Sequence, residues 1–387
     1  MTGVRPVSAL AVVLALPGLL GACDGGTAGR SRGGRPSAST LAPLPGVTPG
    51  HVPAQDVYAA TRAGMVSAAA RDVPERVYVP NSKAATVDVI DPRSFRVVGE
   101  LPVGRVPQHV VPSWDLRRLY VTDDASNDLI PIDPRSAKPA GPAIPVDDPY
   151  NLYFTPDGQR AIVVAEARGR LDFRDPRTFA LSKALPVRCR GVDHLDFAAD
   201  GSYLVASCEF SGLLVKVDLR SEEVVGYLHV GGMPQDVRLD PSGEIFYVAD
   251  MKLGGVHEVA AQTFTQVGFV PTGPEAHGLV LSRDGRSFYV ANRGGPKNRG
   301  SVSVLDVLSR QVVATWVVPG GGTPDMGGVS ADGRVLWLSG RRSRVVYAFD
   351  TETGQLLARV PVGLEPHGAC VWPQPGRYSV GHTDNMR

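Results

Sequence analysis

The sequence predicts an all-β fold, a seven-bladed β-propeller whose blades are four-stranded antiparallel sheets. A unit of about 42 residues recurs seven times between Arg76 and Gly376, the period of a propeller blade. Each unit contains short runs with the alternating or β-branched pattern of strands, as in residues 86–91 and 213–218. The 44 glycines and 33 prolines are typical of many short strands joined by tight turns.

The first 22 residues have the features of a bacterial lipoprotein signal peptide. Arg5 precedes an apolar run, residues 7–20, that is too short to span a membrane comfortably. The run ends in Leu-Gly-Ala-Cys23, which matches a lipobox, so Cys23 is the expected lipidation site and first mature residue. The alternative is an ordinary secreted protein with a chance cysteine. The prediction is an extracytoplasmic protein anchored to the membrane of a bacterial cell envelope.

Two segments separate this signal from the repeats. Residues 23–50 are rich in Gly, Ser, Thr and Pro and contain few apolar anchors, which predicts a flexible tether. Residues 51–75 contain short apolar groups and are expected to form an N-terminal extension packed on the exterior of the ring.

The propeller is assigned to residues 76–376 because a tight turn follows each inner run at a regular interval. The turns fall at Asp115, Gly158, Gly201, Gly243, Gly285, Gly333 and Gly376. The one long interval contains two insertions rich in loop formers, residues 293–300 and 320–323. We expect the ring to close by pairing the last inner run, residues 367–372, with the strands of residues 77–103. The first and last repeats then share one blade, which protects their edges.

The C-terminal tail, residues 377–387, resembles the start of another second strand but is too short to build a blade. Our preferred prediction is a strap that faces solvent. The alternative is that His382 and Asp384 join the opening of the ring.

Export permits disulfides, and two cysteines are placed to form one. Cys189 lies just before an inner strand, and Cys208 ends the strand that returns from it. The antiparallel hairpin brings them close, so they are either a candidate disulfide or two free buried thiols. Cys370 is expected to be a small core residue.

Four recurring segments carry a family resemblance: Tyr78-Val-Pro-Asn81, Tyr120-Val-Thr-Asp123, Tyr247-Val-Ala-Asp250 and Tyr289-Val-Ala-Asn292. Each is followed by a run like Val87-Asp-Val-Ile-Asp91 or its equivalent, and together they resemble the YVTN-repeat family of β-propellers. The resemblance implies a seven-bladed ring related to the haem-binding propeller of dissimilatory nitrite reductase, the propeller of nitrous-oxide reductase and the heavy chain of amine dehydrogenases. It implies the fold more than the chemistry, because the family is functionally diverse.

The starts of the inner strands and the ends of the strands that follow them are expected to meet at one opening of the ring, here called the mouth. The strand ends would contribute Asp123, Glu166, Cys208, Asp250 and Asn292. The candidate ligand-binding residues at the strand starts are His109, Asp193, His194, Asp236, His277, Asp325 and His367.

These residue types leave three interpretations open. Imidazole and carboxylate groups bind zinc, copper or non-haem iron, and histidine also ligates haem. They can also act as catalytic acids and bases. The third interpretation is that they are consensus residues of the repeat, bonded to backbone or water, because we expect positions on opposite blades to lie ~10 Å or more apart, too far for one ion.

The remaining features limit the function classes. The chain has no GxSxG or P-loop motif, and no GxGxxG motif between a strand and a helix. The absence of CxxCH excludes covalent attachment of c-type haem. A net charge of +1 gives no reason to expect nucleic acid. We expect a monomeric, membrane-anchored binding scaffold for a protein, envelope component or small ligand, rather than an enzyme. The alternative is a metal- or haem-handling propeller, or a lactonase-like hydrolase, that uses the mouth residues.

Overall fold

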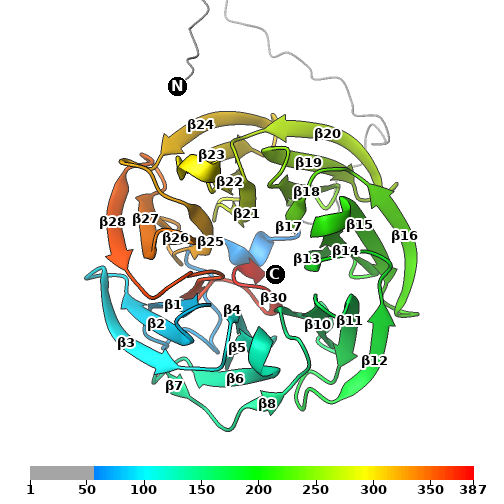
Figure 1. Ribbon diagram of the computed structural model, residues 1–387, viewed down its shortest axis with the longest axis horizontal. Helices are drawn as coiled ribbons and strands as arrows, with labels where there is room; N and C mark the ends of the chain where they lie inside the picture. The colour runs from blue at the N-terminus through cyan, green and yellow to red at the C-terminus, as the bar shows by residue number, and fades with distance from the viewer. Residues whose placement is uncertain (1–55) are drawn as a thin grey trace, which may run out of the picture. The chain divides into compact units, whose positions relative to one another are not determined.

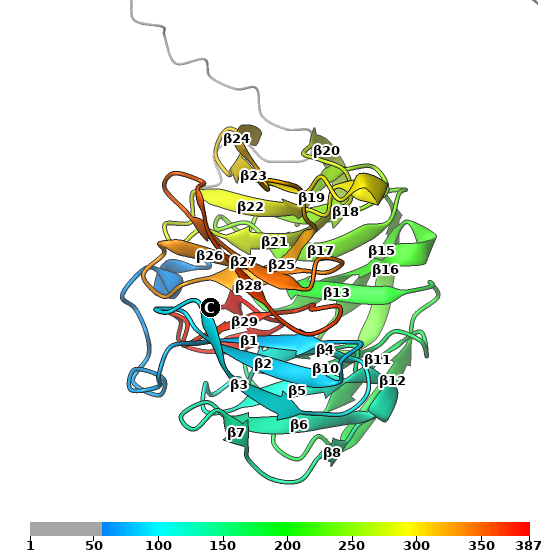
Figure 2. The same cartoon turned by 60° about the vertical axis from the view of Figure 1, so that its left-hand side comes forward.

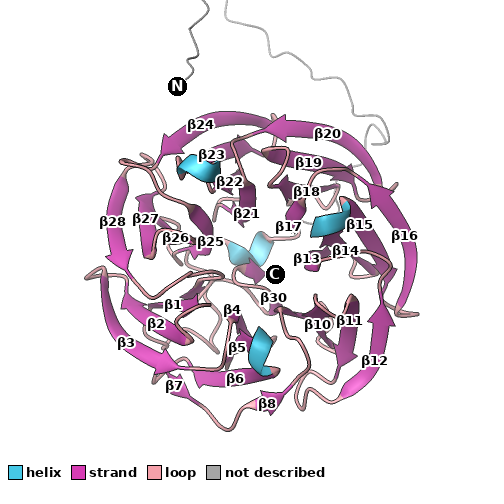
Figure 3. Ribbon diagram, in the orientation of Figure 1, coloured by secondary structure: helices cyan, strands magenta, loops and turns pink. Residues whose placement is uncertain are grey.

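The computed structural model describes residues 56–387, which form a ring of seven β-sheets around a central axis (Figure 1 and Figure 3). The seven-bladed prediction is therefore confirmed. The predicted signal peptide, Cys23 and the tether of residues 23–50 lie outside the described residues. Within residues 56–387, no helix has the length and hydrophobicity needed to cross a membrane.

Each blade runs from an inner strand near the axis to an outer strand. Blade 1 contains β29 (Cys370–Trp372), β1 (Arg76–Asn81), β2 (Thr86–Asp91) and β3 (Arg96–Pro102). Blade 2 contains β4 (Pro107–Pro112), β5 (Leu119–Asp123), β6 (Asp128–Asp133), β7 (Lys138–Pro139) and β8 (Ile144–Pro145). Blade 3 contains β9 (Asn151–Phe154), β10 (Ala161–Ala165), β11 (Arg170–Arg174) and β12 (Leu181–Pro186), extended by β30 (Ser379–Gly381) and β31 (Asn385–Met386).

The other four blades follow in chain order. Blade 4 contains β13 (Val192–Phe197), β14 (Tyr203–Cys208), β15 (Leu213–Asp218) and β16 (Glu223–His229). Blade 5 contains β17 (Pro234–Leu239), β18 (Ile245–Asp250), β19 (Gly255–Ala260) and β20 (Thr265–Pro271). Blade 6 contains β21 (Ala276–Leu281), β22 (Ser287–Asn292), β23 (Ser301–Asp306) and β24 (Gln311–Val317). Blade 7 contains β25 (Pro324–Val329), β26 (Val335–Gly340), β27 (Val345–Asp350) and β28 (Leu356–Pro361).

The helical elements among the described residues are short 3-10 turns. They are η1 (Ala59–Thr61), η2 (Asp124–Ser126), η3 (Glu209–Ser211) and η4 (Gly295–Lys297).

The core lies between neighbouring blades, because both faces of each inner strand are covered. Val205 of β14 and Val248 of β18, for example, belong to one buried cluster between blades 4 and 5. The outer strand β16 instead alternates between exposed and partly buried residues, as expected where one face meets water.

The ring closes as predicted, with β29 antiparallel to β1 (Figure 2). Val77 pairs with Val371 and Tyr78 with Cys370, so residues from the two ends of the repeat region form one blade. This pairing covers the inner edge of β1.

The preferred prediction for the tail was wrong. Residues 377–387 lie at the ring centre (Figure 1), where β30 pairs with β9 through Gly381 and Tyr153. Residues 379–387 are all buried and fill the centre of the ring. A strap on the surface would instead have left them exposed to solvent. The tail has too few residues for a blade, and it packs against the inner strands, where the backbone N–H of His382 donates to Leu152 O at 2.9 Å.

The N-terminal extension also differs from its predicted place on the outer wall. Its described part begins at Asp56, and η1 lies across one end of the ring axis (Figure 1). The hydroxyl of Tyr58 donates to the backbone oxygen of Leu239, 3.0 Å away, at the end of inner strand β17. The extension therefore covers the end of the axis opposite the mouth.

Cys189 and Cys208 are joined by a disulfide, with their Cα atoms 5.9 Å apart. Cys370 is a free, buried thiol in β29. The bridge ties the loop that enters β13 to the end of β14, next to the mouth.

Candidate functional site

Bulges at the starts of inner strands place the candidate residues at the axis. In β13, Val192 pairs with Cys208 and Leu195 with Ala206, so two residues, Asp193 and His194, stand opposite one. The same shift occurs in β4, β17, β21 and β25. A bulge bends the strand and redirects its side chains. Because the bulge recurs with the repeat, it brings equivalent residues of different blades together.

Hydroxyl side chains of the second strands stabilise these bulges. The backbone N–H of His194 donates to Ser207 Oγ at 3.1 Å, and that of His109 donates to Thr122 Oγ1 at 3.1 Å. Each bond satisfies a backbone donor that the bulge removes from the ladder. The imidazoles are therefore held in fixed positions.

Five histidines meet at the ring centre, and none is more than 2% exposed: His109, His194, His277, His367 and His382. Their ring centroids are 4.8 Å apart for His109 and His367, 5.5 Å for His109 and His194, and 5.8 Å for His277 and His367. The structure thus brings together the four predicted histidines at distances shorter than the expected separation of opposite blades. The fifth, His382, comes from the tail and was considered only as the less favoured alternative.

One group of three, here called the histidine triad, consists of His109, His194 and His382. One potential ligand atom from each lies within 4.8 Å of the other two. Both ring nitrogens of His109 and His194, and Nδ1 of His382, have no hydrogen-bond partner among residues 56–387. Buried polar atoms in proteins are normally paired, so these nitrogens are available to a ligand.

Two carboxylates stand behind the triad. Asp193 Oδ1 lies 2.9 Å from His194 Nδ1, although the angle does not suit a hydrogen bond, and Asp236 Oδ1 lies 3.4 Å from His382 Nε2. Carboxylates behind histidines orient the rings of metal sites and raise their basicity. Asp193 and Asp236, both predicted for the mouth, are therefore neighbours of candidate ligands.

A second group, His277, Asp325 and His367, has the same spacing but is already engaged. Asp325 Oδ1 accepts from two nitrogens of Arg293 at 2.8 Å, and His277 Nδ1 lies 2.9 Å from the same oxygen. The Nδ1 atom of His367 is hydrogen-bonded to Gln108 Oε1 at 3.1 Å. Arg293 and Gln108 thus bind this second group directly, whereas among residues 56–387 the triad has near it the carboxylates of Asp193 and Asp236 and no hydrogen bond to its free nitrogens.

The sequence pattern of the YncE-like β-propellers matches residues 34–375. The chain belongs to this family. The assignment agrees with the YVTN-type propeller predicted from the repeats. None of the curated proteins compared with the chain matches it significantly.

Solved structures similar to this YncE-like propeller include proteins with different activities. One is dihydro-heme d1 dehydrogenase NirN in complex with DHE, at 17% identity and a TM-score of 0.59, covering 79% of this chain and 77% of that one. Another is Kuenenia stuttgartiensis hydrazine synthase, at 18% identity and a TM-score of 0.59, covering 75% and 99%. A third is a putative 6-phosphogluconolactonase from Bacteroides uniformis, at 15% identity and a TM-score of 0.63, covering 77% and 99%. These likenesses show the fold alone.

Burial favours the neutral form of four of the five central imidazoles of this YncE-like propeller. It lowers the pKa of His109 and His367 well below the usual range, with nearby positive groups adding to the effect, and lowers that of His382 to about 4. Burial also acts against charge on His194, but the Asp193 carboxylate outweighs it and raises the pKa. A neutral imidazole has a lone pair for a metal, so His109 and His382 are suited to ligation at neutral pH, whereas His194 beside Asp193 must lose a proton when it binds an ion.

Three partly buried carboxyl groups lie at the mouth, just after second strands. Burial, then repulsion by Asp193, raises the pKa of Glu166 to about 8 and that of Glu209 to about 7. Burial and contact with Asp148 raise the pKa of Asp124 to about 7. The mouth is therefore acidic on the side of blades 2 to 4. Sequence reasoning anticipated Glu166, and the other two follow immediately after predicted strand ends.

Other residues predicted for the mouth have structural roles. Asp123 Oδ2 accepts from the backbone N–H of Gly104 at 2.7 Å, and Asp250 Oδ2 accepts from that of Met233 at 3.0 Å. The amide oxygen of Asn292 accepts from the hydroxyl of Thr272 at 2.9 Å. These repeat residues hold the segments that connect blades, and Cys208 is in the disulfide.

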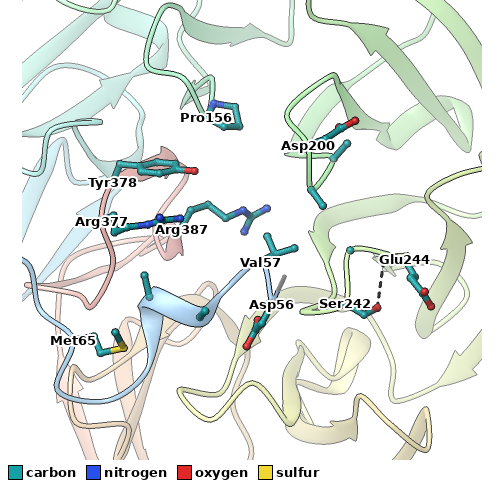
Figure 4. A pocket seen from close by; sticks show the side chains of 15 residues that line it. Asp56, Val57, Met65, Pro156, Asp200, Ser242, Glu244, Arg377, Tyr378 and Arg387 are labelled. Carbon is teal, nitrogen blue, oxygen red and sulfur yellow. Dashed lines mark hydrogen bonds between the residues drawn. The ribbon is translucent and has the colours of Figure 1, made fainter. Parts of the chain in front are cut away.

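A pocket of about 560 Å³ lies at the other end of the inner strands (Figure 4). It is lined by the N-terminal extension, the turns after β9, β13 and β17, and the tail. Arg387 extends into it, but Nη2 of Arg387 donates to Asp196 Oδ1 at 2.7 Å. Because this charge is already paired, the pocket is a weaker candidate than the triad.

Proposed function

We propose that this YncE-like propeller binds a transition-metal ion on the ring axis through His109, His194 and His382. The observation that carries the proposal is the set of three buried imidazoles whose potential ligand atoms converge within 4.8 Å and whose nitrogens are largely unpartnered. Each unpartnered buried polar atom costs about 1–3 kcal/mol, a cost that a bound ion would offset.

The relative orientation of the rings also favours a bound ion over hydrogen bonds between the imidazoles. Neutral imidazoles that face one another can share few hydrogen bonds, because each has one donor and one acceptor in a fixed plane. The rings of His194 and His382 are tilted by 44° at a centroid distance of 4.9 Å, and no hydrogen bond joins them. A cation accepts all their lone pairs at once.

The ligand set favours zinc or copper. Three imidazoles with a fourth position left to water or another ligand are typical of catalytic zinc sites, and imidazole also suits copper. Haem is a poorer fit, because centroids about 5 Å apart leave no space for a macrocycle between the rings.

Location is a second part of the proposal. The lipobox at Cys23 and the tether of residues 23–50 support a propeller held at the outer face of a membrane. A propeller that binds a metal ion there would be an envelope metal-binding protein. This function combines the binding role expected from the sequence with the histidine site.

Metal analysis tests the proposal. The full-length protein is stripped with a chelator, equilibrated with Zn²⁺ or Cu²⁺, and passed over a desalting column before elemental analysis. We expect about one retained ion per chain, as for a single three-histidine site. His109→Ala with His194→Ala should abolish retention, whereas His229→Ala, on the exposed end of β16, should not. No retained ion, or equal retention in the double variant, would contradict the proposal.

A further inference from the structure

We propose that the second central group, His277, Asp325 and His367, binds a second and more weakly held divalent metal ion beside the first, so that the ring centre is a dinuclear metal site. One potential ligand atom from each of these residues lies within 4.8 Å of the other two, the same convergence as in the triad. None of the three residues is more than 2% exposed. The inference rests on the proposed function, because it adds a neighbour to the ion of the triad.

Arg293 contacts only one oxygen of the Asp325 carboxylate. Both Nε and Nη2 of Arg293 lie 2.8 Å from Oδ1. The other oxygen, Oδ2, is buried and has no hydrogen-bond partner among residues 56–387. Because the ion pair with Arg293 favours the ionised carboxylate, Oδ2 has a lone pair free for a ligand. A buried oxygen in this state is costly, and a bound cation would offset that cost.

The hydrogen bond of His367 leaves a second lone pair beside this oxygen. Gln108 Oε1 can only accept, so Nδ1 of His367 donates the hydrogen in their 3.1 Å contact. In the neutral imidazole the lone pair is then on Nε2, which lies 3.7 Å from Asp325 Oδ2. These two acceptors have no hydrogen to share, but two metal–ligand bonds of about 2.0–2.2 Å would span the distance between them. Gln108 would then orient the ring, as outer partners of metal ligands do.

His277 offers the third ligand. Its Nδ1 lies 2.9 Å from Asp325 Oδ1, yet this nitrogen forms no hydrogen bond with any of residues 56–387. Two imidazoles and one carboxylate are a ligand set of zinc and of non-haem iron. The second group therefore contains the donors of a metal site as well as an ion pair.

The second group and the triad are direct neighbours at the ring centre. The ring centroids of His367 and His109 are 4.8 Å apart, and those of His277 and His194 are 6.0 Å apart. Each histidine of the second group thus lies beside a member of the triad. Ions bound to the two groups would be close to one another, the arrangement of a two-metal site.

Arg293 makes the second site the weaker of the two. Its guanidinium lies 2.8 Å from one oxygen of Asp325 and repels a cation that approaches the other. The second ion should therefore bind when free metal is present and be lost on a desalting column that retains the ion of the triad.

The test uses Cu²⁺, which has the highest affinity of the first-row divalent ions for such ligands and is detected by electron paramagnetic resonance. Metal-free, full-length protein is dialysed against increasing free Cu²⁺, and bound copper is measured at each step. We expect about two ions per chain at saturation, and a resonance signal that broadens as the second ion binds beside the first.

His277→Ala and His367→Ala should each weaken binding of the second ion by more than about 100-fold, since each removes a ligand. Both variants should keep the first ion and show no broadening, and the retained first ion shows that they are folded. His229→Ala, on the exposed end of β16, is the matched control and should bind both ions.

The outcomes separate this inference from the proposed function. A single ion that depends on His109 and His194 would overturn the inference and leave the proposed function intact. Two ions without broadening, or a second ion unaffected in both variants, would also overturn it, because that ion lies elsewhere. A single ion that depends on His277 and His367 would support metal binding by the second group and contradict the triad. A chain that binds no copper would contradict both.

Discussion

The imidazole of His382 lies 4.9 Å, between ring centroids, from that of His194, although the two residues belong to the tail and to an inner strand of blade 4. The backbone N–H of His382 donates to Leu152 O at 2.9 Å, which fixes the tail against β9. The triad is therefore assembled from the propeller repeats and from a segment outside them.

His382→Ala should lower metal affinity while the ring stays folded. Removing a residue that only hydrogen-bonds a metal ligand costs about 10–100-fold in metal affinity. Loss of the ligand itself should therefore cost more than about 100-fold. Competition with a chromophoric chelator measures the affinity, and circular dichroism monitors the fold. His229→Ala is the control on the outer strand β16. Unchanged affinity in His382→Ala would remove the tail from the site.

Gly381→Ala should have a similar effect without touching a ligand. Gly381 has φ +98°, and an added Cβ would lie 2.3 Å from Tyr153 Cα and 2.4 Å from Leu152 O. Because both contacts are with backbone, the tail must shift, and His382 moves with it. Gly99→Ala is the control, since its nearest contact would be an ordinary 3.7 Å.

The same chelator competition checks this prediction. We expect about tenfold or greater loss of metal affinity in Gly381→Ala, the range for residues that position ligands, and none in Gly99→Ala. Wild-type affinity in Gly381→Ala would show that the position of the tail does not matter for the site.

The repeat explains why so much was predictable from the sequence. The spacing of the turns determines the blades and the ring closure, and equivalent strand starts place His109 and His194 at one mouth. His382 was placed there only by the less favoured alternative, because the tail follows no repeat and only tertiary packing determines its path.

Cys23→Ala should release the protein from the membrane fraction. Lipid attachment and ring packing involve separate parts of the chain, so the released protein should keep its thermal stability and metal content. Fractionation of cells followed by immunoblotting measures the release, with Cys370→Ser as the control for loss of a cysteine. A membrane-bound Cys23→Ala variant would argue against the lipid anchor.

Glu166→Gln should stabilise the protein at alkaline pH. Burial, then repulsion by Asp193, raises the pKa of Glu166 to about 8, above the value of about 4.3 for an unfolded chain. The folded state therefore binds the proton more tightly, and stability is lost as the pH rises from about 4.3 through 8. After allowance for solvent screening, we expect a Tm about 2–4 °C higher than wild type at pH 9.

Little difference between Glu166→Gln and wild type is expected near pH 4, where both side chains are neutral. Glu223→Gln, an exposed carboxyl at the start of β16, should behave like wild type at both pH values. Thermal melts of the metal-free protein across this range make the comparison. A stabilisation equal at pH 4 and pH 9 would contradict the burial of the Glu166 charge.

Arg387→Ala should destabilise the whole ring, because Arg387 joins the tail, the extension and an inner strand. Its guanidinium donates to Asp196 Oδ1 at 2.7 Å and lies 4.3 Å from the ring centroid of Tyr58. Removing one member of a buried ion pair leaves the other charge unpaired, which costs about 3–5 kcal/mol. Denaturant unfolding should show this loss, and Asp196→Asn should recover part of it in the double variant, since the leftover charge is then absent. If the double variant is as unstable as the sum of the two single variants, the pair makes no specific contribution, and the tail is held by its backbone pairing with β9 alone.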